Sequence, residues 1–560
     1  MATHDFVDWK DEPIGQARHG GARAVLFIYI MAMLTDMSCT PIYMNMINYL
    51  HGTLHMDVAS SSITMTNFFG ATCGFALLGG FISDAYITRF RTLLLFCPLI
   101  VLGQGLLALH AHYLSLSPLE LKVESHGFNS SILYMGLYTL ALGEAFFRAN
   151  LPPFGADQFD DNDILSSRNK SSYFNWLSFI CTGGSIIGLI FIVWIENNRS
   201  WVEGFVVSAN LMVLGILVLI SGFKFYRNQI PSGSPLTRIM QVFVAAFRKR
   251  DLPLPQIGEL HQGNSNEEMV GEELEHTMDF RFLDKAAISY GITSSKWSLC
   301  TVTQVEEAKI VLRMLPIFIS TVFAYTPMHL LATFGLLQAN TMRTTRLGTF
   351  TISPVSLIAI PYALQMVFIV VYDRLFVRLT KRITGYQTGI TQLQRVGVGL
   401  MLLPLTMCIA AIIERERKRI AEEYDLIDSI NTHLPMSITW LGPQYFGMVV
   451  IGVFTYIGLL EFFNSETSRG MKSMGSAMFS CVIGLSSLLS SVVVNVVKNA
   501  SRDEDGGRNG WMEGNNLNKS YLDRFYWLVS VFSLVGSLSY LFWAHKYVYK
   551  RSRLTIFQNS

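Results

Sequence analysis

The sequence predicts an all-α membrane protein with twelve transmembrane helices in two six-helix bundles, and three observations support this prediction. Of the 560 residues, 51% are hydrophobic and 15% are charged, whereas soluble domains carry roughly 25% charged residues. The hydrophobic residues form blocks of about 20, the length that crosses a bilayer as a helix. These blocks are too uniformly apolar for barrel strands, which alternate between lipid and lumen.

The apolar windows define the expected spans and divide the chain into segments. The twelve windows are 24–50, 60–82, 92–112, 131–152, 172–195, 202–226, 310–330, 349–372, 395–413, 438–464, 473–497 and 523–547. The expected organisation is a cytoplasmic segment 1–23, a first bundle 24–226, a cytoplasmic linker 227–309, a second bundle 310–547 and a cytoplasmic tail 548–560.

Basic residues indicate which side of the membrane each connection faces. Arg and Lys gather in alternate connections that share a side with both termini, so the positive-inside rule assigns these connections and both termini to the cytoplasm. One connection disagrees, because residues 414–428 are rich in Arg and Lys on the assigned outer side. Acidic residues accompany them, and we interpret this stretch as an outward helical extension with mixed charge.

The linker begins with a predicted amphipathic helix. Within residues 234–250, one helical face carries Leu236, Ile239, Met240, Phe243 and Phe247. The stretch ends in the basic run Arg248 to Arg250. Such a helix is typical of a membrane interface.

Equivalent loops of the two halves carry similar charges, as expected for a duplicated bundle. After the second span, Asp84 precedes Arg89 and Arg91, and after the eighth span Asp373 precedes Arg374. We interpret these residues as a gating latch at the cytoplasmic mouth, where charge pairs would hold two helices together while the other side is open.

Four ionisable residues stand out inside the predicted spans, where charge is costly and usually marks a pathway. They are Asp36 in the first span, Glu144 and Arg148 in the fourth and Glu461 in the tenth. Glu144 and Arg148 share a helical face at spacing i, i+4, so they form either a self-neutralised structural pair or part of a site.

In the second interpretation, the guanidinium of Arg148 binds an anionic substrate and Glu461 is its titrating partner from the other half. Glu461 could alternatively be an interfacial residue with no such role. His329, which falls at the end of the predicted seventh span, is a further candidate that titrates near neutrality.

Several function classes are disfavoured. The sequence lacks the H-E-x-x-H, Walker A and G-x-S-x-G motifs, and its seven cysteines show no C-x-x-C spacing. We therefore expect no enzyme, no cofactor and no metal. The formal net charge of +2 also gives no reason to expect a nucleic-acid partner.

Several blocks resemble the plant nitrate and peptide transporter family, a branch of the proton-coupled oligopeptide transporters in the major facilitator superfamily. The blocks are MGLYTLALGEAFFRANLPPFGADQFD (135–160), SYFNWLSFICTGGSI (172–186), FRFLDKA (280–286), LLQANTM (336–342), GITQLQRVGVGL (389–400) and LLEFFNSETSRGMKSMGSA (459–477). The resemblance implies the major facilitator fold. It also implies roles in substrate binding and proton coupling for Arg148, where the family normally has Lys, and for Glu461. It makes Thr92 a phosphorylation candidate.

The chain also departs from the family pattern. Two glutamates of the family's first-helix proton-coupling motif are replaced by Ala32 and Thr35, and the basic third position is Asp36, which could take over a carboxylate role or pair with Arg148. The nitrate-binding His of nitrate carriers would fall on Met328, one residue before His329, which turns the side chain by about 100°.

The sequence therefore predicts a proton-coupled secondary transporter that imports a small organic anion by alternating access, with protons and the lipid bilayer as further partners. The resemblance favours a carboxylate hormone such as abscisic acid or gibberellin, or a specialised metabolite. Substrate binding is assigned to Arg148, Glu461, Asp36 and His329, and proton coupling to Glu461, Asp36 and Glu144. A nitrate or di/tripeptide symporter is the alternative, and a ligand sensor that does not transport is the alternative from another class. The plasma membrane is the expected location and the vacuolar membrane the alternative, while the oligomeric state stays open.

Overall fold

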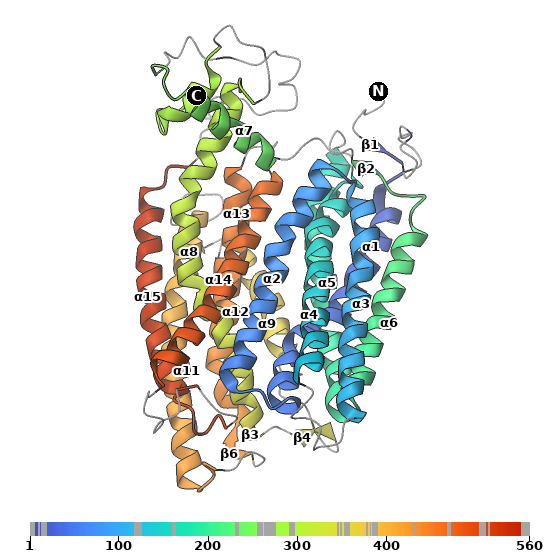
Figure 1. Ribbon diagram of the computed structural model, residues 1–560, viewed down its shortest axis with the longest axis vertical. Coiled ribbons are helices and arrows are strands. Elements are labelled where there is room, and N and C mark those ends of the chain that lie inside the picture. The colour runs from blue at the N-terminus through green and yellow to red at the C-terminus, as the bar shows by residue number, and fades with distance from the viewer. Residues whose placement is uncertain are drawn as a thin grey trace.

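The structure is a computed structural model in which helices run side by side through one elongated bundle (Figure 1). The residues that it describes are 6–8, 12, 19–116, 126–159, 164–229, 235–254, 261, 276–289, 297–343, 346–347, 350–351, 359–376, 379–380, 382, 390–428, 433–467, 472–502, 511–512 and 516–549.

The first half contains six long helices. They are α1 (Gly21–Asn48), extended by the π-helical turn η1 (Tyr49–Thr53), α2 (Val58–Ala85), α3 (Arg89–Leu116), α4 (His126–Ala156), α5 (Ile164–Asn198) and α6 (Trp201–Ser221). The short strand β1 (Phe6–Val7) pairs antiparallel with β2 (Asn228–Gln229) and joins the start of the chain to the segment after α6.

The second half follows a linker that contains α7 (Pro235–Arg248) and the 3-10 helix η4 (Arg281–Ala287). Its spans are α8 (Val302–Thr341), α9 (Ala359–Val371) with the π-helical turn η6 (Tyr372–Phe376), α11 (Gln392–Glu423), the composite span η7 (Ile438–Leu441), α12 (Gly442–Ile451), η8 (Gly452–Tyr456) and α13 (Ile457–Glu466), then α14 (Lys472–Ala500) and α15 (Leu522–Lys546). Two strand pairs lie in its connections, β3 (Met342–Arg343) with β6 (Leu434–Ser437) and β4 (Arg346–Leu347) with β5 (Phe350–Thr351).

These helices confirm the predicted all-α membrane fold. Eleven described stretches are long and apolar enough to cross a bilayer, and the shorter apolar helix α9 lies inside the expected window 349–372. Helices α8 and α11 continue past their expected windows to Thr341 and Glu423. Each of the two begins with a capping box, at Thr301 and Thr391, which satisfies main-chain N–H groups of the first turn.

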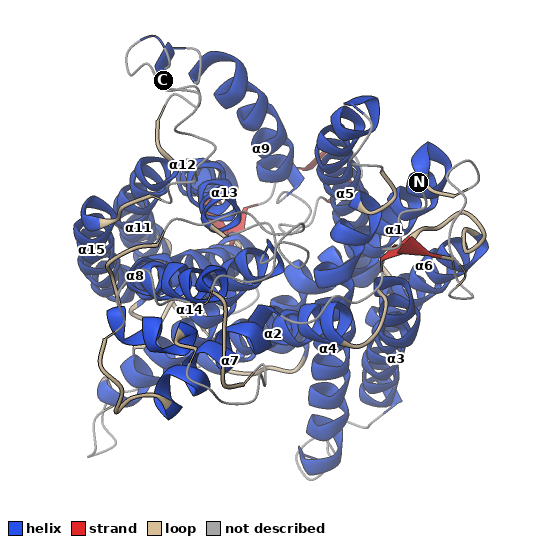
Figure 2. Ribbon diagram, turned by 90° about the horizontal axis from the view of Figure 1, so that it is seen from above, coloured by secondary structure: helices blue, strands red, loops and turns tan. Residues whose placement is uncertain are grey.

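Viewed from above, the helices of the first half and those of the second gather on opposite sides, with α2 and α14 between them (Figure 2). Glycines permit the closest contacts inside a half. A Cβ atom on Gly103 would lie 2.6 Å from the main-chain nitrogen of Leu140, and one on Gly143 would lie 2.8 Å from that of Ile100. Helices α3 and α4 therefore pack backbone against backbone, as small residues allow in membrane bundles.

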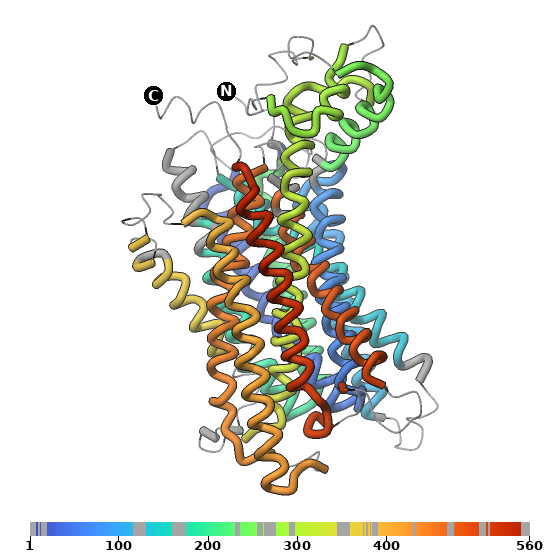
Figure 3. Tube along the Cα trace, turned by 90° about the vertical axis from the view of Figure 1, so that its left-hand side faces the viewer, coloured from blue at the N-terminus to red at the C-terminus, as the bar shows by residue number. Residues whose placement is uncertain are grey.

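The linker packs against the first turns of α8 and forms a lobe at one end of the bundle, which we call the linker end (Figure 3). Ile239 of α7, Leu283 of η4 and Val305 of α8 share its hydrophobic core. The predicted amphipathic helix is present as α7. Ile239 is buried within the lobe, whereas Met240 and Phe247 are exposed.

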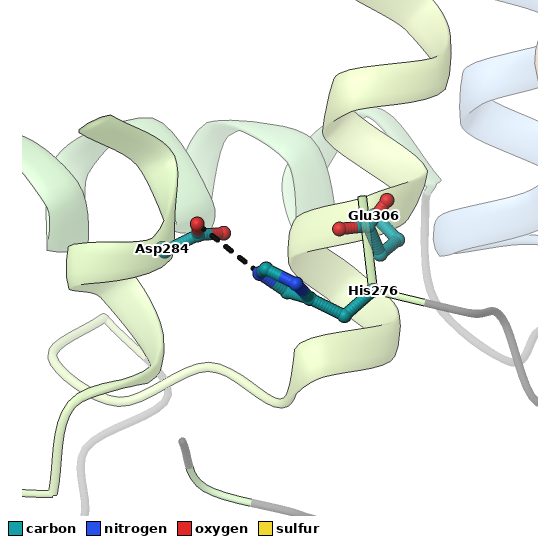
Figure 4. Close-up of side chains that lie close together, drawn as sticks. All are labelled: His276, Asp284 and Glu306. Carbon is teal, nitrogen blue, oxygen red and sulfur yellow. Dashed lines mark ion pairs between the residues drawn. The ribbon is translucent and has the colours of Figure 1, made fainter. Parts of the chain in front are cut away.

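Buried charges hold the lobe to α8. Ligand atoms of His276, Asp284 and Glu306 lie within 4.8 Å of one another (Figure 4), a grouping that could suit a metal ion. The ammonium of Lys309, which is fully buried, lies 2.8 Å from both carboxylates. Because this ammonium already supplies the positive charge, we assign the cluster a structural role.

The two halves are fastened together at the opposite end. Helix α2 meets α14 there: the Ser487 hydroxyl donates to the carbonyl of Thr66 at 2.7 Å, and the Thr66 and Ser491 hydroxyls share a short hydrogen bond. Lys498 forms an ion pair with Asp57 at 2.6 Å. Residues far apart in the sequence thus close the opposite end.

Candidate functional site

The first-half charges predicted from the sequence meet between α1 and α4. Arg148 contacts Glu144 one turn before it on α4, with Nε 2.7 Å and Nη2 2.6 Å from Glu144 Oε1. The Asp36 carboxylate on α1 lies 3.9 Å from Arg148 Nη2. The helical spacing i, i+4 creates the first contact, and the packing of α1 near α4 creates the second.

The three side chains differ in exposure. Arg148 is 51% exposed, whereas Asp36 is 17% and Glu144 only 1% exposed. The Oε2 atom of Glu144 is buried, and the Glu144 carboxylate also interacts with the Tyr43 hydroxyl. The guanidinium is therefore the open member of the cluster, and the carboxylates lie behind it.

Tyrosine side chains from both halves interact with the guanidinium. The ring of Tyr43 on α1 lies 5.8 Å from Arg148 Cζ, and the Tyr43 hydroxyl bonds Thr72 of α2 at 2.9 Å. From the second half, the phenols of Tyr362 on α9 and Tyr456 in η8 lie close enough to interact electrostatically with Arg148. Arg148 thus faces the space between the two halves.

Glu461 lies on α13 in the second half and has a different partner from the one that the sequence suggested. Its Oε2 atom lies 3.1 Å from Nη1 of Arg395 on α11. Here the carboxylate is 48% exposed and the guanidinium only 8% exposed. The competition of Glu461 for Arg148 stays a prediction, because the structure pairs each of them with another residue.

His329 lies within α8, not at its end, because the helix continues for twelve residues to Thr341. Its Nε2 atom is 3.0 Å from the Ser486 hydroxyl of α14, and its ring contacts Phe69 of α2 with centroids 6.4 Å apart. His329 therefore borders the α2–α14 contact between the halves. Its assignment as a substrate ligand stays a prediction.

The predicted gating residues are only partly described. Arg89 at the start of α3 pairs with Asp157 at 2.5 Å and donates to the Gln229 side chain at 3.0 Å. Arg91 is exposed on the same turn. The side chains of Asp84, Asp373 and Arg374 lie outside the described residues, and the latch stays a prediction.

Thr92, the phosphorylation candidate, is fully buried, and its hydroxyl donates to the carbonyl of Thr88 at 3.1 Å. A kinase could reach this hydroxyl only after the first turn of α3 opens.

Sequence reasoning missed Arg395 and the second-half phenols. Arg395 stands at the first position of a predicted span, where a basic residue is typical of the membrane interface, so nothing marked it as a partner of Glu461. It also missed that Glu414 and Arg417, assigned to an outer connection, form a fully buried pair at 2.7 Å on α11. This pair explains part of the charge that contradicted the positive-inside rule.

In the described part of the chain, eleven apolar stretches of membrane-spanning length and the shorter α9 form two halves. With a cation exposed between the halves, this is the architecture of a membrane transporter of the major facilitator class. The sequence profile described as "PTR2: POT family" matches residues 90–512. The chain therefore belongs to the POT family.

Its relatives include plant members of this family. "Protein NRT1/ PTR FAMILY 4.4" of Arabidopsis thaliana is 37% identical over 97% of this chain and 90% of its own length. "Protein NRT1/ PTR FAMILY 4.3" of the same species is 36% identical over 97% of this chain and 93% of its own length.

Solved structures share the fold. An auto-inhibited POT family peptide transporter has a TM-score of 0.67 at 18% identity, with 95% of this chain and 98% of that chain covered. A POT family transporter in complex with 5-aminolevulinic acid has a TM-score of 0.60 at 11% identity, with 94% and 98% covered.

Proposed function

We propose that this POT family transporter couples proton movement to the import of a small organic anion whose acid group binds Arg148. The observation that carries the proposal is the exposure of the Arg148 guanidinium between the two halves, while its carboxylate neighbours are buried behind it. If Glu144 and Arg148 only neutralised each other, we would expect both side chains to be buried.

The geometry of the guanidinium favours a planar anion. Glu144 lies on the edge formed by Nε and Nη2. The edge formed by Nη1 and Nη2 is not the one that Glu144 contacts, and its geometry matches a carboxylate in bidentate fashion. The Asp36 carboxylate lies 3.9 Å from Nη2 and repels the acid group of a bound substrate. This repulsion favours release of the substrate.

The aromatic surroundings favour a substrate with an apolar body. The ring of Tyr43 lies beside the guanidinium, and the phenols of Tyr362 and Tyr456 lie within electrostatic range of it. Ligand sites commonly combine apolar walls with a few polar anchors. A carboxylate hormone such as abscisic acid or gibberellin has this chemistry. Nitrate lacks an apolar body and would leave these rings without a partner.

A di- or tripeptide is the second candidate, and one observation favours it. Glu461 is half-exposed in the second half, so a zwitterion could place its carboxylate on Arg148 and its ammonium on Glu461.

Two carboxyl groups support proton coupling. Glu461 is half-exposed, so water reaches its carboxylate. Glu144 is almost fully buried, so a proton on its carboxylate would remove the cost of burying a charge.

Labelled uptake in oocytes tests the proposal. Wild type, Arg148→Ala and the control Arg419→Ala, which removes an exposed arginine on α11, are compared at acidic and neutral pH with abscisic acid, gibberellin, nitrate, a dipeptide and a glycoside. We expect carboxylate uptake that is greater at acidic pH and is lost in Arg148→Ala alone. Binding without accumulation would favour the sensor, and wild-type uptake independent of pH would reject proton coupling.

A further inference from the structure

Arg395 connects three parts of the second half. Its Nη1 atom lies 3.1 Å from Glu461 on α13, and Nη2 donates to the main-chain carbonyl of Val453 at 3.0 Å. Its guanidinium carbon lies 4.2 Å from the ring centre of Tyr372 in η6, within the range of a cation–π contact. One buried cation thus touches the eighth span and two places on the tenth.

The Val453 contact falls in an irregular turn of the tenth span. Val453 belongs to the π-helical turn η8, which separates α12 from α13. A π-helical turn shifts the main-chain hydrogen bonds out of α-helical register and is frequent at functional sites. Arg395 supplies a donor to this turn from a neighbouring helix and so stabilises the joint between α12 and α13.

Close packing keeps Arg395 in place. A Cβ atom on Gly399 of α11 would lie 2.1 Å from Thr455 Oγ1, and one on Gly458 of α13 would lie 2.9 Å from Val396 and 3.4 Å from the Arg395 stem. Because α11 and the tenth span are in contact along this stretch, the guanidinium has little room to move. The half-exposed carboxylate is the member of the pair that can separate.

Arg395 and two phenols lie on the elements that pack around α13. Helix α11 presents Arg395, and the turns η6 and η8 present the phenols Tyr372 and Tyr456. Helix α14 contributes Met478 and Phe479 to the hydrophobic cluster that also contains residues of α13.

We propose that Arg395 is the positioning residue for Glu461: the ionised carboxylate ties α13 to α11 through Arg395, and protonation of Glu461 releases α13 to move about η8. The inference rests on the proposed proton coupling and adds the group that converts protonation into movement. Charge-assisted hydrogen bonds are roughly twice as strong as neutral ones, so loss of the charge weakens the tie without breaking the helix.

The first test is the pH profile of uptake. Replacing Arg395→Gln removes the cation that favours ionised Glu461, so half-maximal uptake should move to higher pH by about one unit, a tenfold change in proton concentration. Arg395→Lys keeps the charge and should keep most of the wild-type profile with slower uptake, and Arg419→Gln is the matched control on α11. An unchanged profile in Arg395→Gln, or a Lys variant that behaves like Gln, would overturn the proposal.

The second test measures the movement without substrate. The Ser465 hydroxyl of α13 lies 3.4 Å from the Gln392 side chain of α11, so Gln392→Cys with Ser465→Cys, in a background without reactive native cysteines, reports on the distance between the two helices. Crosslinking by a short thiol reagent should fall at acidic pH, and adding Glu461→Gln should keep it low at every pH. Crosslinking that changes neither with pH nor with Glu461→Gln would contradict the inference. If uptake proves independent of pH while crosslinking depends on it, the proposed coupling fails and the role of Arg395 stands.

Discussion

The two halves present their ion pairs in opposite ways. In the first half the guanidinium of Arg148 is open and the carboxylates of Glu144 and Asp36 lie behind it. In the second half the carboxylate of Glu461 is open and the guanidinium of Arg395 is buried. In these two sites, therefore, each half exposes one charge and buries the opposite charge.

This inversion indicates that the exposed member of an ion pair determines what the pair can exchange. An open cation can exchange a protein carboxylate for a substrate acid, whereas an open carboxyl group can exchange its cation for a proton. We infer a division of labour in which the first half binds the anion and the second half responds to pH. Four substitutions test this comparison.

The largest effect is expected for Arg148→Ala, which removes the open cation. Charge-assisted hydrogen bonds contribute about 1.5–3 kcal/mol, so transport efficiency for an anion should fall by about tenfold to a hundredfold. Concentration dependence of initial uptake, with surface expression measured alongside, checks this. Arg148→Lys should recover part of the loss, and full uptake by the Ala variant would remove the first half of the comparison.

Glu461→Gln should affect pH dependence more than affinity. The amide cannot ionise, so the ratio of uptake at acidic and neutral pH should fall close to one, while the substrate concentration for half-maximal uptake changes by less than about threefold. A variant that keeps the wild-type ratio would show that protons act elsewhere, and Glu144 would be the next candidate.

Glu144→Gln should change uptake less than the two substitutions above, and it tests whether Glu144 competes with substrate for Arg148. The amide oxygen can still accept from the guanidinium, but it no longer neutralises it, so an anionic substrate should bind about threefold more tightly. Because tighter binding slows release, the maximal rate should fall. Competition assays give the affinity, and weaker binding would argue that Glu144 positions Arg148 more than it competes with substrate.

The smallest effect is expected at the opposite end, from Asp57→Asn. Burial opposes ionisation of Asp57, but hydrogen bonds from Lys498 and Ser60 outweigh it and hold the pKa of the carboxyl below its usual value. A lowered pKa means that the ion pair is complete above the ordinary Asp range and is lost only as pH falls below it. The variant should therefore change uptake by up to about fivefold, which is about 1 kcal/mol, and by the same factor at mildly acidic and neutral pH. A change confined to one pH would place a proton-sensitive element outside the two ion pairs.

Hydropathy was enough to predict the spans, because a helix that crosses lipid must be predominantly apolar wherever it packs. The contact of Glu144 with Arg148 was equally predictable, since four residues make one helical turn. His329 was misplaced because the apolar window ended before the helix did, and α8 carries its polar residues onward to Thr341 against neighbouring helices.

The sequence by itself determined which stretches cross the membrane, that the first, fourth and tenth of them carry the candidate charges, and that Glu144 and Arg148 share a face. Only the tertiary structure decided that Glu461 meets Arg395, 66 residues away, and which charge of each pair is open. Local spacing dictates contacts within one helix, whereas partners and exposure depend on how separate helices pack. Small residues such as Gly399 and Gly458 permit this packing, but in the sequence they cannot be told from other glycines in apolar runs.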